Sequence, residues 1–171
     1  MRQILLVCTG NTCRSAMAHG ILKKLAEERG LNLEIISAGT AAMPGDSATQ
    51  QAIEAMQDYG IDLTEHRSRP LNPEIIQNAD VILAMTKNHR RQILARFPEA
   101  EAKTYVLKEL AYANRNNDKL GQEKGEVEKN PSIDVDVNDP FGQSVEVYRK
   151  TAKEIEDALV ALLDNVLEVE Q

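Results

Sequence analysis

The chain has 171 residues, of which 42% are hydrophobic and 27% charged, and its formal net charge is −7. This length and composition are typical of a globular domain that buries its own core, so we expect residues 1–171 to form a single domain. The acidic balance argues against a nucleic-acid partner. No apolar run approaches the roughly 20 residues that span a bilayer, so we also expect no membrane partner.

The chain contains two cysteines, Cys8 and Cys13, which lie too close together in the sequence to act as a disulfide framework. Free thiols of this kind suit a reducing compartment. The first residues already have the apolar pattern of a strand, so we expect no signal peptide and a cytoplasmic location.

Apolar runs alternate with helical periodicities along the chain. We expect strands at residues 3–7, 33–37, 80–85 and 104–107. We expect helices at residues 16–28, 46–59, 73–78, 86–97 and 144–167. This alternation predicts an α/β fold, a three-layer sandwich with a parallel sheet, right-handed crossovers and helices on both faces.

Cap signals accompany several of these helices. Gly30 and Gly60 are expected to end the first two, because glycine is favoured just beyond a helix C-terminus. Asp46 or Ser47 is expected to cap the second helix, and Thr86 the fourth, because short polar side chains satisfy the first free amides.

Residues 113–138 are rich in asparagine, glutamate and lysine and have almost no apolar periodicity. Polar segments of this kind bury little and form exposed loops, so we expect a charged loop insertion at about 113–138. It has two interpretations, a solvated insertion or a flap that borders the site and helps to choose substrates.

The first strand and first helix are joined by Cys8-Thr9-Gly10-Asn11-Thr12-Cys13-Arg14-Ser15. Loop amides and a helix N-terminus form an anion site, and the Arg14 fork suits a tetrahedral oxyanion. Such surroundings favour the thiolate of Cys8, which is the form needed for covalent phosphoryl transfer. Gly10 and Asn11 are residue types that tolerate the positive φ expected of a phosphate-cradling loop.

That octet, together with Ser37-Ala38-Gly39 and Asp139-Pro140-Phe141-Gly142, resembles the low-molecular-weight protein tyrosine phosphatase family. Within that family it is most similar to the bacterial branch of protein arginine phosphatases. The resemblance implies a four-stranded sheet in the order 2-1-3-4, the phosphotyrosine protein phosphatase I-like fold. It also implies phosphorylated protein substrates, inorganic phosphate as product, and no metal ion or cofactor.

The expected chemistry begins with attack by Cys8 on phosphorus, with Arg14 and loop residues Thr9, Gly10, Asn11, Thr12 and Cys13 around the phosphate. Ser15 is expected to donate a hydrogen bond to the Cys8 sulfur, to cap the first helix, or to do both. The leaving group needs a proton, and the residues alone leave Asp134, Asp136 and Asp139 open as its donor. The family pattern selects Asp139, and Pro140 would restrict its backbone to an extended conformation.

The resemblance also implies that Asn11, Ser15, Ser37 and His66 form a hydrogen-bond network beneath the loop. Taken alone, His66 has the sequence surroundings of a surface histidine. Cys13 has two interpretations, a buried small residue or a partner that forms a reversible disulfide with Cys8 on oxidation.

Thr12 is the most informative side chain for substrate choice. Tyrosine-specific members commonly carry isoleucine there, whereas arginine phosphatases carry threonine, so the resemblance favours phosphoarginine over phosphotyrosine. Phe141-Gly142 after Asp-Pro points the same way, because tyrosine-directed members usually have tyrosines there. A third hypothesis is a non-catalytic module that binds phosphorylated ligands without turnover.

Overall fold

The computed structural model describes residues 2–113 and 134–167. Its sheet has four parallel strands in the order β2-β1-β3-β4. The strands are β1 (Arg2–Cys8), β2 (Leu33–Gly39), β3 (Val81–Ala84) and β4 (Thr104–Val106). The helices are α1 (Arg14–Glu28), α2 (Gln50–Gln57), α3 (Pro73–Asn78), α4 (Lys87–Arg96), the 3₁₀ helix η1 (Pro98–Lys103), α5 (Leu107–Tyr112), α6 (Val145–Leu162) and the π-helix η2 (Leu163–Leu167). The predicted fold class and strand order are confirmed.

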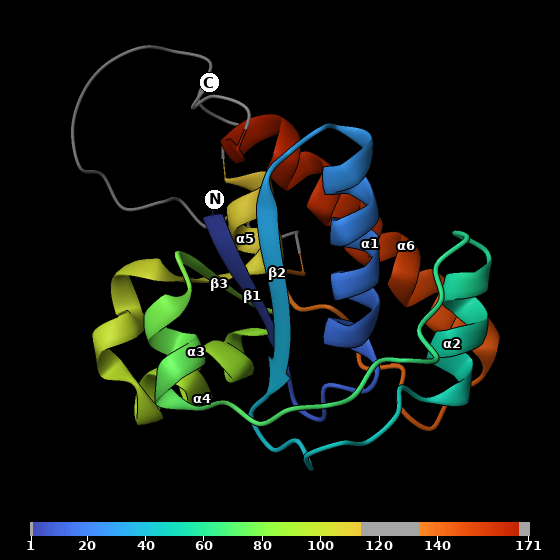
Figure 1. Cartoon of the computed structure of the whole chain (residues 1–171), viewed down its shortest axis with the longest axis horizontal. Helices are drawn as coiled ribbons and strands as arrows, with labels where there is room; N and C mark the ends of the chain where they lie inside the picture. Colours follow the sequence, from blue (N-terminus) through green and yellow to red (C-terminus); the bar gives the residue numbers. More distant parts are fainter. Residues whose placement is uncertain (1, 114–133, 168–171) are drawn as a thin grey trace.

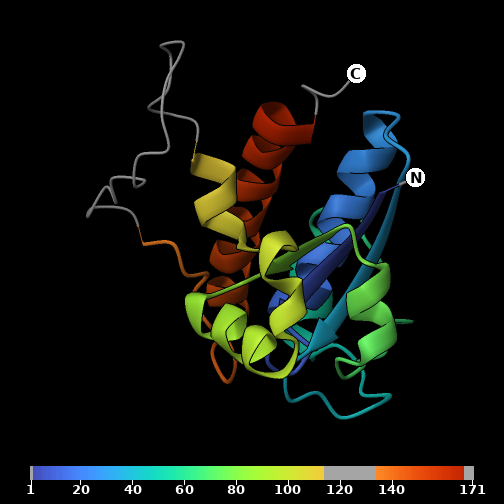
Figure 2. The ribbon, with the colours of Figure 1, turned by 90° about the vertical axis from the view of Figure 1, so that its left-hand side faces the viewer.

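Helices cover both faces of the sheet, as Figures 1 and 2 show. Alternate side chains of β1 point to opposite faces of the sheet and pack in two different hydrophobic cores. Ile4, Leu6 and Cys8 pack in the core shared with α1, α2, α5 and α6. Leu5 and Val7 pack in the second core, which includes residues of α3, α4 and η1. A central strand buried on both faces explains why its sequence shows no polar alternation.

The sheet register brings the ends of β1 and β2 together. Cys8 pairs with Gly39, and the amide of Thr40 then donates to the Cys8 carbonyl at 2.9 Å. A Cβ added to Gly39 would lie 2.3 Å from the Thr9 carbonyl oxygen, so only glycine fits at this close approach. The loop after Cys8 is therefore supported by the start of the loop after β2.

The start of the second helix was predicted wrongly. Asp46 and Ser47 do not cap α2, because both are held in an extended pairing with the chain at residues 67–68. Ser47 forms a bridge with Arg67, and the Asp46 carbonyl accepts from the amide of residue 68 at 2.8 Å. Thr49 is the cap instead, and its hydroxyl accepts from the Ala52 amide. This long-range pairing leaves no trace in the local sequence pattern.

Other boundaries follow their predicted signals. Thr86 caps α4, and Gly30 and Gly60 adopt positive φ values of 66° and 69° beyond α1 and α2. Ser144 caps α6, while the short helices η1 and α5 were not predicted. Most of the predicted insertion, residues 114–133, lies outside the described residues.

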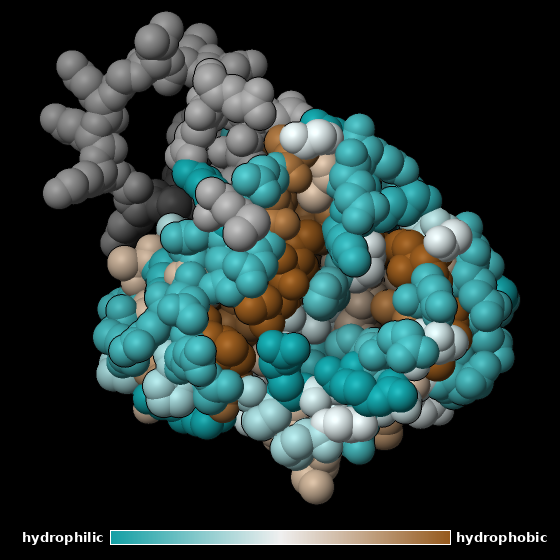
Figure 3. Space-filling view, in the orientation of Figure 1, coloured by the Kyte–Doolittle hydropathy of each residue, from teal (hydrophilic) through white to brown (hydrophobic). Residues whose placement is uncertain are grey.

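Strand β2 is one of the two edge strands of the sheet and pairs with β1 on one side. Its hydrophobic residues Ile35 and Ile36 are consequently half-buried, and a hydrophobic band is visible over this part of the molecule in Figure 3. Polar residues cover most of the rest of that face. Among the described helices, none is both long and apolar enough to span a membrane.

Candidate active site

The loop between β1 and α1 is held from within by Asn11. Its backbone is left-handed, with φ of 57°, and its side chain is fully buried. The side-chain amide donates to the Ser15 hydroxyl at 2.8 Å, and its carbonyl oxygen accepts from the Arg69 amide at 3.0 Å. Gly10 is not in the left-handed region, so the positive φ predicted for both residues holds for Asn11 alone. The polar Asn11 side chain makes the local contacts that offset this conformation.

The Cys8 thiol lies within hydrogen-bond distance of two groups of Ser15. Its sulfur is 2.9 Å from the Ser15 hydroxyl and accepts from the Ser15 amide at 3.5 Å. Because the Asn11 amide can only donate, the Ser15 oxygen accepts there and its own proton remains for the Cys8 sulfur. Both the hydroxyl and the amide of Ser15 can therefore donate to the Cys8 sulfur. Ser15 lies within α1, whose N-cap is Cys13, so the alternative prediction that Ser15 caps this helix is wrong.

The Arg14 side chain connects the loop to the segment before Asp139. This guanidinium is 7% exposed; it donates to the Val137 carbonyl at 3.1 Å and lies 3.6 Å from a carboxylate oxygen of Asp139. The Val137 amide in turn donates to the carbonyl of Met85, the residue directly after β3, at 2.9 Å. The segment that carries the Asp139 carboxyl group is therefore held at the loop by hydrogen bonds of Val137 with Arg14 and with the end of the sheet.

From the residues alone, three aspartates are candidates for the general acid, and the structure gives each of them different hydrogen-bond partners. Asp136 accepts from the Lys87 amide at 2.8 Å, at the N-terminus of α4, and Asp134 accepts from the Asp136 amide at 3.0 Å. The carboxylates of Asp136 and Asp134 therefore both accept hydrogen bonds from backbone amides. Asp139 accepts from the Phe141 amide at 3.1 Å, yet its side chain remains 57% exposed and lines the pocket.

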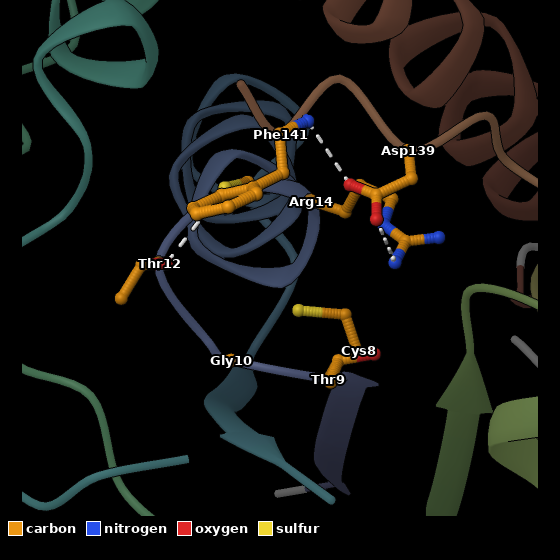
Figure 4. A pocket seen from close by; sticks show the side chains of 8 residues that line it. Cys8, Thr9, Gly10, Thr12, Arg14, Asp139 and Phe141 are labelled. Atoms are coloured by element: carbon orange, nitrogen blue, oxygen red, sulfur yellow. Dashed lines mark hydrogen bonds and ion pairs between the residues drawn. The ribbon is translucent and has the colours of Figure 1, made fainter. Parts of the chain in front are cut away.

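These groups line a pocket of about 240 Å³. Figure 4 shows the Cys8 sulfur pointing into the space between the loop and the segment that carries Asp139 and Phe141. The Phe141 ring, 68% exposed, lies toward the Thr12 side in this view, and the carboxylate of Asp139 lies toward Arg14. The lining residues are Cys8, Thr9, Gly10, Thr12, Cys13, Arg14, Asp139 and Phe141.

His66 contributes to the loop as the resemblance implied. Its Nε2 is 2.6 Å from the Asn11 carbonyl, which must accept, so Nε2 carries the proton. Burial lowers the pKa of His66, which keeps the ring neutral. Within the described part of the chain, Ser37 is not in this network, and its hydroxyl instead bonds His19 Nδ1 at 3.1 Å. Ser37 lies opposite Leu6, two positions before the register reaches Cys8, and is therefore too far back along the sheet.

His19 makes stability depend on pH. Burial, followed by the charges of His66, Lys23 and Arg69, lowers the pKa of His19 from 6.5 to about 4. Between those values the unfolded chain binds more protons, so the free energy of unfolding contributed by this site is lost as the pH falls from 6.5 toward 4. We expect the variant His19→Gln, which cannot titrate, to lose less stability than the native chain between pH 7 and pH 5 in urea unfolding. Equal losses in the two proteins would contradict this expectation.

Two buried residues next to the loop were not predicted from the sequence. Tyr148 on α6 is fully buried, and its hydroxyl lies 3.4 Å from the Cys13 sulfur. His89 on α4 is 3% exposed and bonds the Thr9 hydroxyl at 2.7 Å. The only sequence signal for His89 is its position three residues after the helix cap Thr86. Cys8 and Cys13 are both free thiols lining one pocket, and their redox pairing stays a prediction.

A cysteine sulfur within hydrogen-bond distance of a serine hydroxyl, a buried arginine and a pocket carboxylate on a parallel α/β sheet are the features of a cysteine-dependent protein phosphatase. Residues 3–171 match the model of the "Low molecular weight phosphotyrosine protein phosphatase" family, and the chain belongs to this family.

The relatives of this chain include both arginine phosphatases and tyrosine phosphatases. The protein-arginine-phosphatase of Bacillus subtilis (strain 168) is 38% identical over 91% of each chain. A solved structure of the YwlE arginine phosphatase, a cysteine-to-serine mutant with a phosphorylated active-site serine, has a TM-score of 0.79 at 37% identity and covers 98% of this chain and 99% of its own. The low molecular weight protein tyrosine phosphatase from T. tengcongensis has a TM-score of 0.82 at 34% identity, with coverage of 97% and 100%.

Proposed function

We propose that this chain hydrolyses phosphoarginine in proteins through a cysteinyl-phosphate intermediate. The observation that carries the proposal is the pocket in which Cys8 faces both the Asp139 carboxyl and a polar wall residue, Thr12. Arginine and tyrosine phosphatases both occur among the relatives, so the substrate must be argued from the pocket.

In the first step the Cys8 thiolate attacks phosphorus in line with the departing nitrogen. The sulfur–phosphorus bond forms as the phosphorus–nitrogen bond breaks, and protonated Asp139 gives its proton to the leaving guanidine nitrogen. Arg14 and the loop amides donate to the phosphoryl oxygens, whose charge they stabilise in the transition state. The contact of Arg14 with the Val137 carbonyl orients the guanidinium for this task.

In the second step water attacks phosphorus, and the Asp139 carboxylate accepts a proton from it. The sulfur–phosphorus bond breaks, which returns Cys8 to the thiolate and releases inorganic phosphate. The Ser15 hydroxyl, 2.9 Å from the Cys8 sulfur, stabilises the negative charge that develops as the sulfur leaves. The phosphorylated serine of the YwlE cysteine-to-serine mutant supports a covalent route for that relative, and by homology for this chain.

The wall of the pocket favours a guanidinium over a phenyl ring. Thr12 is polar and smaller than an aliphatic wall residue, and the protonated carboxyl group of Asp139 can still accept from a guanidinium N–H group through its carbonyl oxygen. Phe141 presents an exposed aromatic ring at the rim, against which a planar guanidinium stacks. Sites that hydrogen-bond a polar substrate discriminate strongly against analogues that lack its donors.

The substrate is tested with two matched peptides, one carrying phosphoarginine and one phosphotyrosine. We expect the native chain to release phosphate faster from phosphoarginine, and Thr12→Ile to shift the ratio of kcat/KM values toward phosphotyrosine by at least about tenfold. Thr12→Ser, which keeps the hydroxyl, serves as the matched control and should retain the native preference.

The other outcomes select the remaining hypotheses. Preference for phosphotyrosine in both the native chain and Thr12→Ile would make the protein a tyrosine phosphatase. Binding of both peptides without phosphate release would support the non-catalytic module.

A further inference from the structure

A histidine outside the pocket lining bonds one of the pocket residues. His89, near the start of α4, lies with Nε2 2.7 Å from the Thr9 hydroxyl, and Thr9 is the residue directly after the nucleophile. Its other ring nitrogen, Nδ1, lies 2.9 Å from the Thr86 hydroxyl. The His89 amide donates to that same hydroxyl at 3.1 Å. A continuous chain of polar groups therefore runs from the cap of α4 to the wall of the pocket.

The donors and acceptors between Thr86 and Thr9 favour one tautomer of the His89 ring. The Thr86 oxygen already accepts from the His89 amide, and in the described part of the chain its hydroxyl has no other partner than His89. If Thr86 donates to Nδ1, then Nε2 carries the ring proton and donates to Thr9. In the Nδ1–H tautomer, the Thr86 hydroxyl proton has no acceptor among the described residues, and the Thr9 hydroxyl would donate its proton to Nε2 of the ring.

We propose that His89 acts as a positioning residue, whose Nε2–H group donates to Thr9 so that the Thr9 hydroxyl donates its own proton to an oxygen of the bound phosphoryl group. Thr9 lines the pocket beside Cys8, and among the described residues its hydroxyl has a side-chain hydrogen bond with His89 alone. The loop would then add a side-chain donor to its backbone amides. The proposal deepens the proposed phosphatase function and rests on it.

The surroundings keep the ring in the required neutral state. Burial and the nearby positive charge of Arg14 lower the pKa of His89 to about 4, although Asp139 and Asp136 act in the opposite direction. At neutral pH the ring therefore has one donor and one acceptor nitrogen, as the chain of hydrogen bonds needs. A charged ring would instead donate from both nitrogens and would leave the Thr86 proton unused.

The test measures binding of inorganic phosphate by calorimetry alongside turnover of the phosphoarginine peptide. We expect Thr9→Val, which keeps the shape and removes the hydroxyl, to weaken phosphate binding by about tenfold or more, because hydrogen bonds to charged groups are the stronger ones. Thr9→Ser should bind as the native chain does. Thr104→Val removes the hydroxyl of a buried threonine away from the pocket, the one that donates to the Ala100 carbonyl, and controls for a general loss of stability.

The role of His89 is separated from packing by a double-mutant cycle. His89→Leu should weaken phosphate binding by about three- to tenfold, and the double variant Thr9→Val/His89→Leu should be no weaker than Thr9→Val alone, because both act through one hydroxyl. His89→Gln, whose amide can still donate to Thr9, should restore most of the loss. Nitrogen-15 chemical shifts of His89 should report the neutral Nε2–H tautomer.

Several outcomes would overturn the inference. These are phosphate affinity of Thr9→Val within about twofold of native, additive losses in the cycle, or an Nδ1–H tautomer. A Thr9→Val loss confined to the peptide, with phosphate binding unchanged, would also overturn it. Phosphate binding needs no turnover, so Thr9-dependent binding by a chain without phosphatase activity would support the inference while contradicting the proposed function.

Discussion

Replacing Cys8 with serine is expected to reduce phosphate release by more than about 10⁴-fold, because a serine hydroxyl at this site lacks the thiolate's nucleophilicity. Binding of inorganic phosphate should persist, since Arg14 and the loop amides are unchanged. Turnover is measured with the phosphoarginine peptide and binding by calorimetry.

The chain provides its own matched control for this change. Cys13→Ser makes the same exchange of sulfur for oxygen five positions away, at a side chain that bonds Tyr148 rather than Ser15. It should cost far less activity than Cys8→Ser. Native-like turnover by Cys8→Ser would contradict the covalent mechanism.

Replacing Asp139 with asparagine is expected to slow hydrolysis of phosphoarginine by about 10²-fold or more, because the departing nitrogen then lacks its proton donor. An aryl phosphate with a good leaving group, such as p-nitrophenyl phosphate, needs little protonation and should lose much less in the step that forms the intermediate. Single-turnover measurements of leaving-group release separate that step from the later attack of water.

Asp136→Asn is the control for Asp139→Asn. Asp136 lies three positions earlier in the same segment but accepts from the Lys87 amide, a role that an asparagine oxygen can keep. This variant should show no dependence on the leaving group. If Asp139→Asn slowed release from both substrates equally, Asp139 would not be the acid.

The local parts of the fold and site could be predicted because their causes lie in neighbouring residues. An uninterrupted apolar run marked β1 as a doubly buried strand, and Thr86 marked the start of α4. The spacing of Cys8, Arg14 and Ser15 places them on one loop and helix start, so their meeting follows from the turn itself.

Contacts between distant segments could not be predicted from those patterns. Ser37 is in the strand that pairs with β1, but the register sets it opposite Leu6, where it bonds His19 instead of the loop. Pairing with residues 67–68 kept Asp46 and Ser47 out of a helix that their local sequence favoured. His89 has an ordinary position near a helix start, and only the packing of α4 against β3 and β4 brings it to Thr9.

The sequence by itself predicted Cys8 as the nucleophile, Arg14 as its partner and the parallel α/β class, because a strand, a glycine-containing loop and a helix start are set by adjacent residues. The tertiary structure decided which carboxylate faces the thiol. Each of the three aspartates between residues 134 and 139 accepts from a backbone amide, but only Asp139 of the three lines the pocket, beside Arg14. The physical reason is that the segment is fixed by hydrogen bonds to β3 and α4, more than 40 residues away along the chain.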